Sequence, residues 1–153
     1  MLKVLTHSWP LLMGVMLLMV GNGIQGTLLG IRGNLVGFTT YQLSYVMAAY
    51  FLGFLFGSWA APKMIRLVGH VRVFAALGSL ISALLVVYPV YPDWVVWTLL
   101  RILAGFCFSG IYITAESWIN NTASNETRGQ ALSAYMIVQM IGIIASQILL
   151  NLP

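Results

Sequence analysis

The chain has 153 residues, of which 60% are hydrophobic and only 7% are charged, with seven lysines and arginines against three aspartates and glutamates. Soluble domains carry about 25% charged residues, so this composition excludes an ordinary water-soluble domain. A net charge of +4 is also found in nucleic-acid-binding proteins, but here the basic residues are spread along the chain and form no patch, so we expect no nucleic-acid partner.

The charged residues divide the chain into five long apolar stretches, and only Arg101 interrupts one of them. Each stretch is long enough to cross the roughly 30 Å hydrocarbon core of a bilayer as a helix. We therefore predict an all-α fold: a polytopic transmembrane helical bundle in a single domain, residues 1–153, with the lipid bilayer as its surroundings. The five predicted helices are about 8–31, 41–62, 71–90, 94–118 and 130–151.

The first predicted helix carries two uncharged amides, Asn22 and Gln25, near the middle of the membrane, among several glycines. Amide side chains in lipid need hydrogen-bond partners, so both should face the inside of the bundle. Two interpretations stay open for them: structural hydrogen bonds between helices, or contact with a substrate.

The second predicted helix contains the small-residue stripe Ala49-x-x-x-Gly53-x-x-x-Gly57, which is typical of closely packed membrane helices. A packing role is the interpretation we adopt for these three residues. The fifth predicted helix presents Gln139 on a partly polar face, with the same two interpretations as the amides of the first helix.

Arg101 lies seven residues into the fourth predicted helix, about 10 Å deep at 1.5 Å per residue. An arginine inside a membrane span usually faces the bundle interior or a water-filled cavity, although at this depth its side chain can also extend to the nearer interface. Gly105, Ser109, Tyr112 and Glu116 follow it at helical spacing, so this helix has a polar or small face that suits a cavity lining or tight packing.

The distribution of basic residues orients the bundle by the positive-inside rule. Arg32 alone falls on one side, beside Asp93, and that side is therefore expected to be periplasmic. The N-terminus is predicted to be cytoplasmic and the C-terminal Pro153 periplasmic. Four tryptophans near the predicted interfaces match an aromatic belt; they are Trp9, Trp94, Trp97 and Trp118. The basic residues on the predicted cytoplasmic side are Lys3, Lys63, Arg66, Arg72 and Arg128.

Glu116 ends the fourth predicted helix, where the helix dipole disfavours a carboxylate. We infer an ion pair with Arg66, Arg72 or Arg128, and the alternative is a solvated carboxylate at the interface. No catalytic set, phosphate-binding loop or metal-ligand spacing is present in the sequence, so an enzyme is disfavoured and no cofactor or metal is expected.

Three motifs taken together resemble the major facilitator superfamily. The segment between the second and third predicted helices resembles the signature loop of that superfamily, and it reads Gly57-Ser-Trp-Ala-Ala-Pro-Lys63-Met-Ile-Arg66-Leu-Val-Gly69-His-Val-Arg72. Arg101-Ile-Leu-Ala-Gly105 resembles the Arg-x-x-x-Gly motif of the fourth helix. Glu116-Ser-Trp-Ile-Asn120, followed by Arg128-Gly129, is similar to the YcaD-like subgroup of bacterial permeases.

The resemblance implies a bacterial inner-membrane permease and a gating or charge cluster, but two departures matter. Arg66 stands where the superfamily's loop usually has an aspartate, so a gating interaction of that aspartate is not carried over. The glycine-proline motif of drug antiporters is absent from the fifth predicted helix, which argues against drug efflux. The cluster consists of Lys63, Arg66, Gly69, Arg72, Glu116 and Arg128, with Gly105 added to the packing residues.

Transporters of this superfamily have twelve helices in two halves, with the substrate held between the halves. Our leading hypothesis is the N-terminal part of a secondary transporter for a small polar or anionic solute, completed by a complementary membrane chain or a second copy. Asn22, Gln25, Arg101 and Gln139 would line its part of the pathway. The alternatives are a non-transporting membrane subunit that uses the bundle as an assembly surface, and a shortened remnant of a transporter gene.

Overall fold

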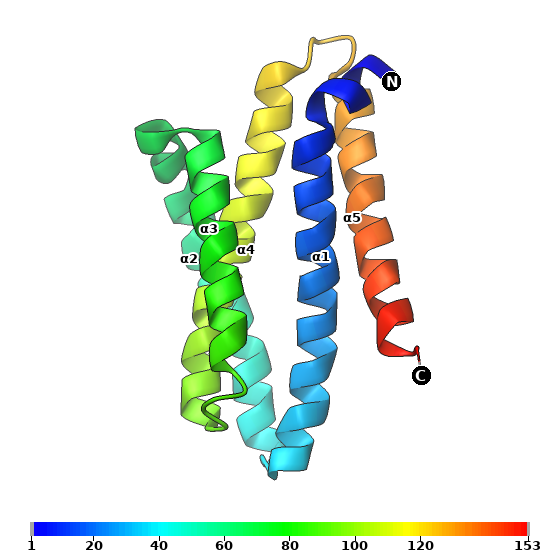
Figure 1. The fold of residues 1–153 in the computed structure, drawn as a ribbon. Helices are drawn as coiled ribbons and strands as arrows, with labels where there is room; N and C mark the ends of the chain where they lie inside the picture. Colours follow the sequence, from blue (N-terminus) through cyan, green and yellow to red (C-terminus); the bar gives the residue numbers. More distant parts are fainter. Residues whose placement is uncertain (1, 153) are drawn as a thin grey trace. The chain divides into compact units, whose positions relative to one another are not determined.

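The computed structural model describes residues 2–152, with side chains from Trp9 onward. These residues form five helices joined by short connections, which confirms the predicted all-α fold (Figure 1). All five helices are long and apolar enough to span a bilayer. The helices are α1 (Leu2–Val36), α2 (Thr40–Val68), α3 (His70–Val87), α4 (Trp94–Thr122) and α5 (Arg128–Leu150).

The connection between the second and third helices differs most from the sequence prediction. Residues 63–70 were expected to form a loop, but α2 continues to Val68 and α3 begins at His70, so that only Gly69 separates the two helices. The amide of Gly69 donates a hydrogen bond to the carbonyl of Ile65 (2.9 Å), and its own carbonyl accepts one from Val73 (3.2 Å). The same glycine therefore makes one main-chain hydrogen bond to each of the two helix ends.

The described helices group into two compact units, and α1 and α4 each contribute to both. The first unit, called the α1/α5 unit, contains the chain up to Leu28 and from Ala115 onward. The second unit, called the α2/α3/α4 unit, contains residues Leu29–Thr114.

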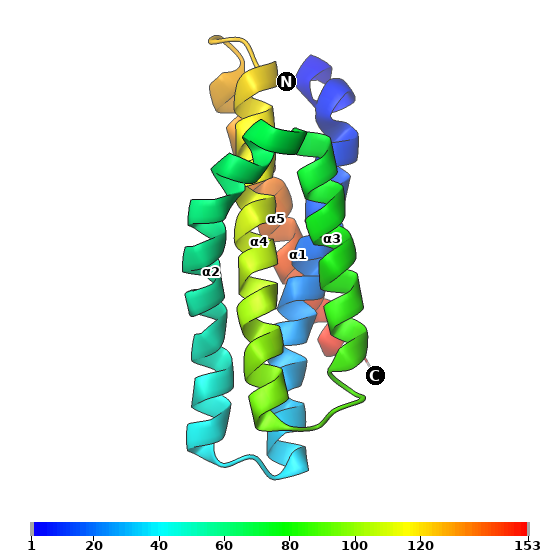
Figure 2. The same ribbon diagram turned by 90° about the vertical axis from the view of Figure 1, so that its left-hand side faces the viewer.

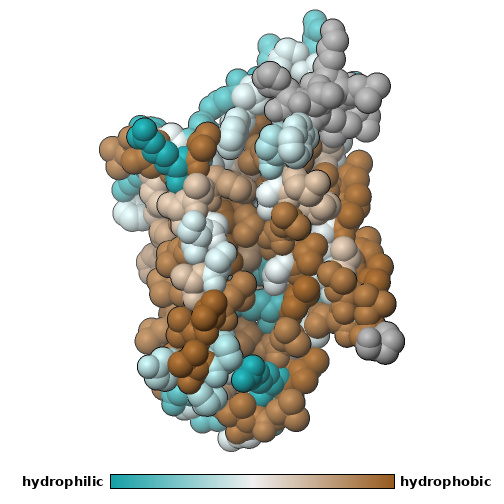
Figure 3. Space-filling view, viewed as in Figure 1, coloured by the Kyte–Doolittle hydropathy of each residue, from teal (hydrophilic) through white to brown (hydrophobic). Residues whose placement is uncertain are grey.

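Within the α1/α5 unit, small residues allow α1 and α5 to lie side by side (Figure 1). A Cβ atom added at Gly142 of α5 would lie 2.8 Å from Cβ of Met19 and 2.9 Å from the carbonyl oxygen of Met16. A Cβ atom at Gly23 of α1 would likewise collide with the side chain of Ser146. The outward side of α5 is hydrophobic (Figure 3), as expected for a lipid-facing surface. Its exposed residues include Met136, Ile137, Met140, Ile144 and Ile148.

Within the α2/α3/α4 unit, α2 and α4 run beside each other in direct main-chain contact (Figure 2). A Cβ atom at Gly53 would collide with the main chain of Ile102. In the opposite direction, a Cβ atom at Gly105 would lie 2.9 Å from the carbonyl carbon of Tyr50 and would collide with its oxygen. Gly57 faces the main chain of α4 in the same way. Glycines on both helices thus make this close approach possible, which is the usual role of small residues in membrane helices.

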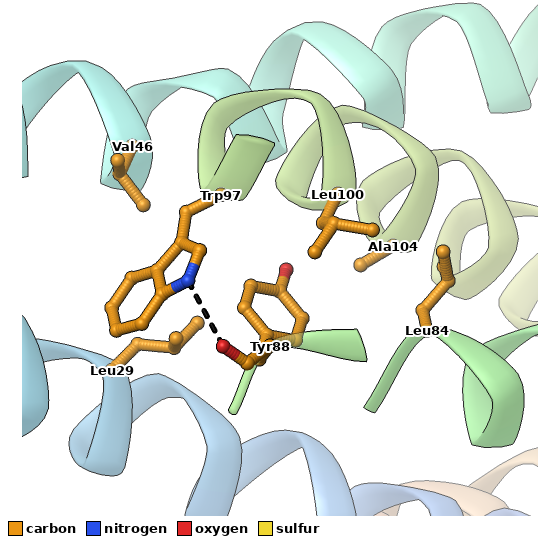
Figure 4. Packing of buried hydrophobic residues seen from close by; sticks show 7 residues of the cluster. All are labelled: Leu29, Val46, Leu84, Tyr88, Trp97, Leu100 and Ala104. Carbon is orange, nitrogen blue, oxygen red and sulfur yellow. Dashed lines mark hydrogen bonds between the residues drawn. The ribbon is translucent and has the colours of Figure 1, made fainter. Parts of the chain in front are cut away.

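A hydrophobic cluster at the α3–α4 turn corrects the interpretation of one tryptophan. Trp97 was predicted to lie in an interfacial belt, but it is completely buried. Its indole Nε1 donates hydrogen bonds to the carbonyls of Tyr88 (3.2 Å) and Tyr91 (2.9 Å), and the ring packs edge-on against Phe38 and Tyr88. Figure 4 shows Trp97 beside Tyr88, with the hydrogen bond between them drawn as a dashed line. The cluster comprises Leu29, Val46, Leu84, Tyr88, Trp97, Leu100 and Ala104.

Candidate functional site

Arg101 is a buried cation on α4, with only 7% of its surface exposed. Its guanidinium carbon lies 4.6 Å from the ring centroid of Tyr50 on α2, which is a cation–π distance. NH2 of the guanidinium approaches the sulfur of Met47 at 4.0 Å, the outer limit for a weak hydrogen bond to sulfur. Nε and NH1 are buried without a hydrogen-bond partner. The guanidinium therefore contacts an aromatic ring and a thioether, and two of its nitrogens remain available to donate hydrogen bonds.

No carboxylate in the α2/α3/α4 unit neutralises this cation. The sequence places a single acidic residue in this unit, Asp93. Its Oδ1 accepts hydrogen bonds from the amides of Val95 (2.8 Å) and Val96 (3.1 Å), so that the carboxylate caps the start of α4. Arg101 follows eight residues later, about 12 Å along the helix axis. The guanidinium therefore carries an uncompensated charge within its own unit, an arrangement that favours binding of an anionic group.

Four aromatic rings extend along α2 and α4 from the guanidinium. Tyr50 lies 6.3 Å from Phe108, and Phe54 lies 6.0 Å from Tyr112, measured between ring centroids. Tyr50 and Phe54 are also neighbours on α2, at 6.2 Å. These rings are not among the site residues predicted from the sequence. Their spacing of four residues on each of two helices was the available signal, since residues i and i+4 share a helix face.

The α1/α5 unit contains the three predicted amides. Gln25 is buried, with 6% of its surface exposed, and neither its amide nitrogen nor its amide oxygen has a hydrogen-bond partner. Asn22, one helical turn before it, and Gln139 on α5 are half-buried. A buried amide without partners is costly in a protein interior, so Gln25 has both a donor and an acceptor available to a polar ligand.

The four predicted solute contacts are thus divided between the two units, with Arg101 in one and the three amides in the other. The residues on the predicted polar or small face of α4 also differ in their burial and contacts. Ser109 is fully buried, with an unpartnered hydroxyl, and Gly105 is used for contact with α2. Tyr112 is half-buried and Glu116 is exposed.

The basic residues of the predicted gating cluster lie on both sides of Gly69. Lys63 and Arg66 are exposed in the last turns of α2, and Arg72 is exposed in the first turn of α3. Gly69 adopts φ +85° and ψ 163°, a combination essentially restricted to glycine. This conformation lets the chain turn within a single residue and holds the three basic residues near one turn.

The remaining members of the predicted cluster, Glu116 and Arg128, belong to the α1/α5 unit. Both are exposed, and the described part of the chain shows no ion pair for Glu116, so its pairing stays a prediction. Pro153 and the side chain of Lys3, which entered the orientation argument, lie outside the described residues. Among the residues that the structure describes, no three His, Cys, Asp or Glu side chains gather into a metal-binding group.

Five membrane-length helices, one carrying a buried cation and another a buried amide, define a polytopic membrane protein. Sequence comparison specifies the family: residues 11–151 match the Major Facilitator Superfamily profile. The chain belongs to this superfamily. No solved structure matches the chain significantly.

Two bacterial proteins illustrate the similarity. An uncharacterized MFS-type transporter of Yersinia pestis is 29% identical over 145 residues, which cover 93% of this chain and 37% of that protein. The uncharacterized MFS-type transporter YcaD of Salmonella arizonae is 27% identical over 149 residues, covering 95% and 39% respectively. The chain thus spans less than two fifths of the length of these relatives. Together with the five apolar helices, the relatives support a multi-pass protein of the bacterial inner membrane.

Proposed function

We propose that residues 1–153 form the N-terminal part of the solute pathway of a secondary transporter, and that the solute is a small polar or anionic molecule. The observation that carries this proposal is the buried guanidinium of Arg101, which has two unpartnered nitrogens and no acidic residue to neutralise it in its own unit. Placing an arginine within a membrane span costs roughly 2.5–3.5 kcal/mol on insertion scales, so an arginine at this depth favours a functional role.

In this proposal the guanidinium holds the anionic group of the solute by charge-assisted hydrogen bonds from Nε and NH1. Within the α1/α5 unit, the amides of Asn22, Gln25 and Gln139 are proposed to offer neutral donors and acceptors to a polar solute. Such groups fix the orientation of a polar solute without adding net charge to the membrane interior. The chain is proposed to act in transport and not in catalysis.

Alternating access requires a second helical bundle, so helices beyond those described here complete the transporter. They can be supplied by a complementary chain, by a second copy or by further sequence of the same polypeptide. We place the N-terminus in the cytoplasm and the C-terminal end of α5 in the periplasm, because this orientation puts most basic residues inside. The turn at Gly69, with Lys63, Arg66 and Arg72, then lies on the cytoplasmic side. The gating role expected of these residues, and of Glu116 and Arg128, stays a prediction.

The test is uptake by cells that express this chain together with the helices that complete the transporter, assayed with a panel of anionic, neutral and cationic solutes. Arg101→Gln should lower uptake of the anionic solute at least about tenfold, because a charge-assisted hydrogen bond contributes about 1.5–3 kcal/mol. Arg101→Lys should give an intermediate rate, since it keeps the charge and loses the planar fork. Arg32→Gln is the matched control, because Arg32 is exposed at the end of α1. Unchanged uptake by Arg101→Gln, at equal protein levels, contradicts the proposal.

A further inference from the structure

One face of α2 carries an apolar groove on its surface, formed by residues of this helix alone. Leu52, Leu55, Phe56 and Trp59 line it, and each of these side chains is more than half exposed. This face differs from the glycine face of α2, which is occupied by α4. The groove is therefore open to the surroundings of the α2/α3/α4 unit.

The same face of α2 becomes basic where the groove ends. The ammonium nitrogen of Lys63 lies 3.6 Å from the ring centroid of Trp59, the last groove residue. Arg66 follows three residues later, and both basic side chains are exposed. Steps of three and four residues connect the apolar and basic side chains, which therefore form one continuous stripe along the helix; the series is Leu52, Leu55, Trp59, Lys63 and Arg66.

The charge of this stripe is not balanced within its unit. Asp93, the only acidic residue of residues 29–114, caps the start of α4. Gly53 of α2 lies against Ile102 of α4, so Asp93, before the start of α4, is level with the early part of α2. At 1.5 Å per residue, Asp93 is therefore about 28 Å from Lys63 along the helix axis. Arg72, across the turn at Gly69, adds a third exposed cation near the end of the stripe. The basic end of α2 therefore attracts anions and has no acidic neighbour in the unit.

We propose that this stripe is a binding site for an anionic phospholipid, with an acyl chain in the groove and the headgroup phosphate on Lys63 and Arg66. The length of the stripe matches one leaflet. Leu52 and Lys63 are about 16 Å apart along α2, and one leaflet supplies about half of the roughly 30 Å hydrocarbon core. Trp59 between them occupies the level where tryptophans anchor at the membrane interface. A free phosphate would leave the groove unused, and an apolar helix in the groove would leave the cations without a counter-charge.

The test measures lipid binding to the purified chain in detergent by native mass spectrometry. The probes are phosphatidylglycerol and phosphatidylcholine with the same acyl chains, and glycerol phosphate as a headgroup without chains. Phosphatidylglycerol should bind more tightly than both. The double variant Lys63→Gln/Arg66→Gln should weaken its binding about 30-fold, the factor that corresponds to about 1 kcal/mol for each basic residue near a membrane surface. Arg32→Gln, which removes an exposed arginine outside the stripe, should leave the binding unchanged.

The groove is tested separately with Leu55→Ala/Phe56→Ala. This variant should weaken both lipids by the same factor and keep the preference for phosphatidylglycerol, whereas Leu149→Ala on the exposed surface of α5 should have no effect. Equal binding of the two lipids, or an unchanged affinity in the Lys63→Gln/Arg66→Gln variant, overturns the proposal. Tight binding of glycerol phosphate would identify a phosphate site in its place. A photo-crosslinker at Leu55 that reacts in cells with protein and never with lipid would also overturn it.

Discussion

The close contact between α2 and α4 predicts that two glycine-to-alanine substitutions will change the free energy of unfolding by different amounts. Gly53→Ala places a methyl group against the main chain of Ile102, where the carbonyl carbon would be 2.6 Å from the new Cβ atom. Because the obstacle is main chain, no side-chain rotation can relieve the collision, and the two helices must separate. Gly78→Ala is the matched control: Gly78 lies in α3 of the same unit, and a Cβ atom there meets nothing within 4 Å.

The magnitudes follow from packing and helix propensity. Overpacking a close contact costs typically 1–3 kcal/mol, against which alanine recovers about 1 kcal/mol over glycine in a helix. Gly53→Ala should therefore lower the free energy of unfolding by up to about 2 kcal/mol, and Gly78→Ala should leave it unchanged or raise it by up to about 1 kcal/mol. Thermal unfolding of the purified chain in detergent, followed by circular dichroism, measures both. If Gly53→Ala is as stable as Gly78→Ala, the close main-chain contact of α2 with α4 is refuted.

Three further substitutions test local features by the same unfolding measurement. Gly69→Ala should cost about 1–3 kcal/mol, because alanine rarely adopts the φ and ψ angles found there, whereas Gly129→Ala, in open helical surroundings, should not destabilise the chain. Trp97→Phe removes the indole donor of the buried hydrogen bond to the carbonyl of Tyr88 and of the part-buried one to the carbonyl of Tyr91, and should cost about 1–3 kcal/mol; Trp59→Phe at an exposed position should change little, and equal effects would contradict the assigned hydrogen bonds. Asp93→Ala should cost about 1 kcal/mol through the lost cap of α4, and Asp93→Asn should retain most of that stability, because its amide oxygen can accept the same hydrogen bonds. An Asn variant as unstable as the Ala variant would show that the negative charge of Asp93, and not the cap, stabilises the chain.

Helix number and type could be predicted because they depend on local composition alone. Uncharged stretches of membrane length leave the helix as the only way to satisfy every main-chain group in lipid. The helix ends were harder to predict. Charged residues such as Lys63 and Arg66 were taken to mark a loop, yet a helix continues through the interface when its side chains can reach water. Gly69, and not the first charge, ends α2.

Tertiary neighbours could not be predicted from one sequence. Arg101 stands out by its charge, but Met47 and Tyr50 surround it only because glycines bring α2 against α4. The small-residue pattern Ala49-x-x-x-Gly53-x-x-x-Gly57 indicated close packing but did not identify the partner helix. Trp97 was misassigned for the same reason: its burial depends on the turn that supplies its hydrogen-bond acceptors, which is invisible in the pattern of a single helix.

The central claim, that Arg101 holds the anionic group of a transported solute, is tested most directly by equilibrium binding of that solute to the completed transporter. Titration calorimetry of the unmodified protein and of Arg101→Gln separates binding from the later steps of transport. The substitution should weaken binding of the anionic solute at least about tenfold and leave binding of a neutral analogue unchanged, because only the charge-assisted hydrogen bonds are lost. Equal affinities of the two proteins for the anionic solute would contradict the claim.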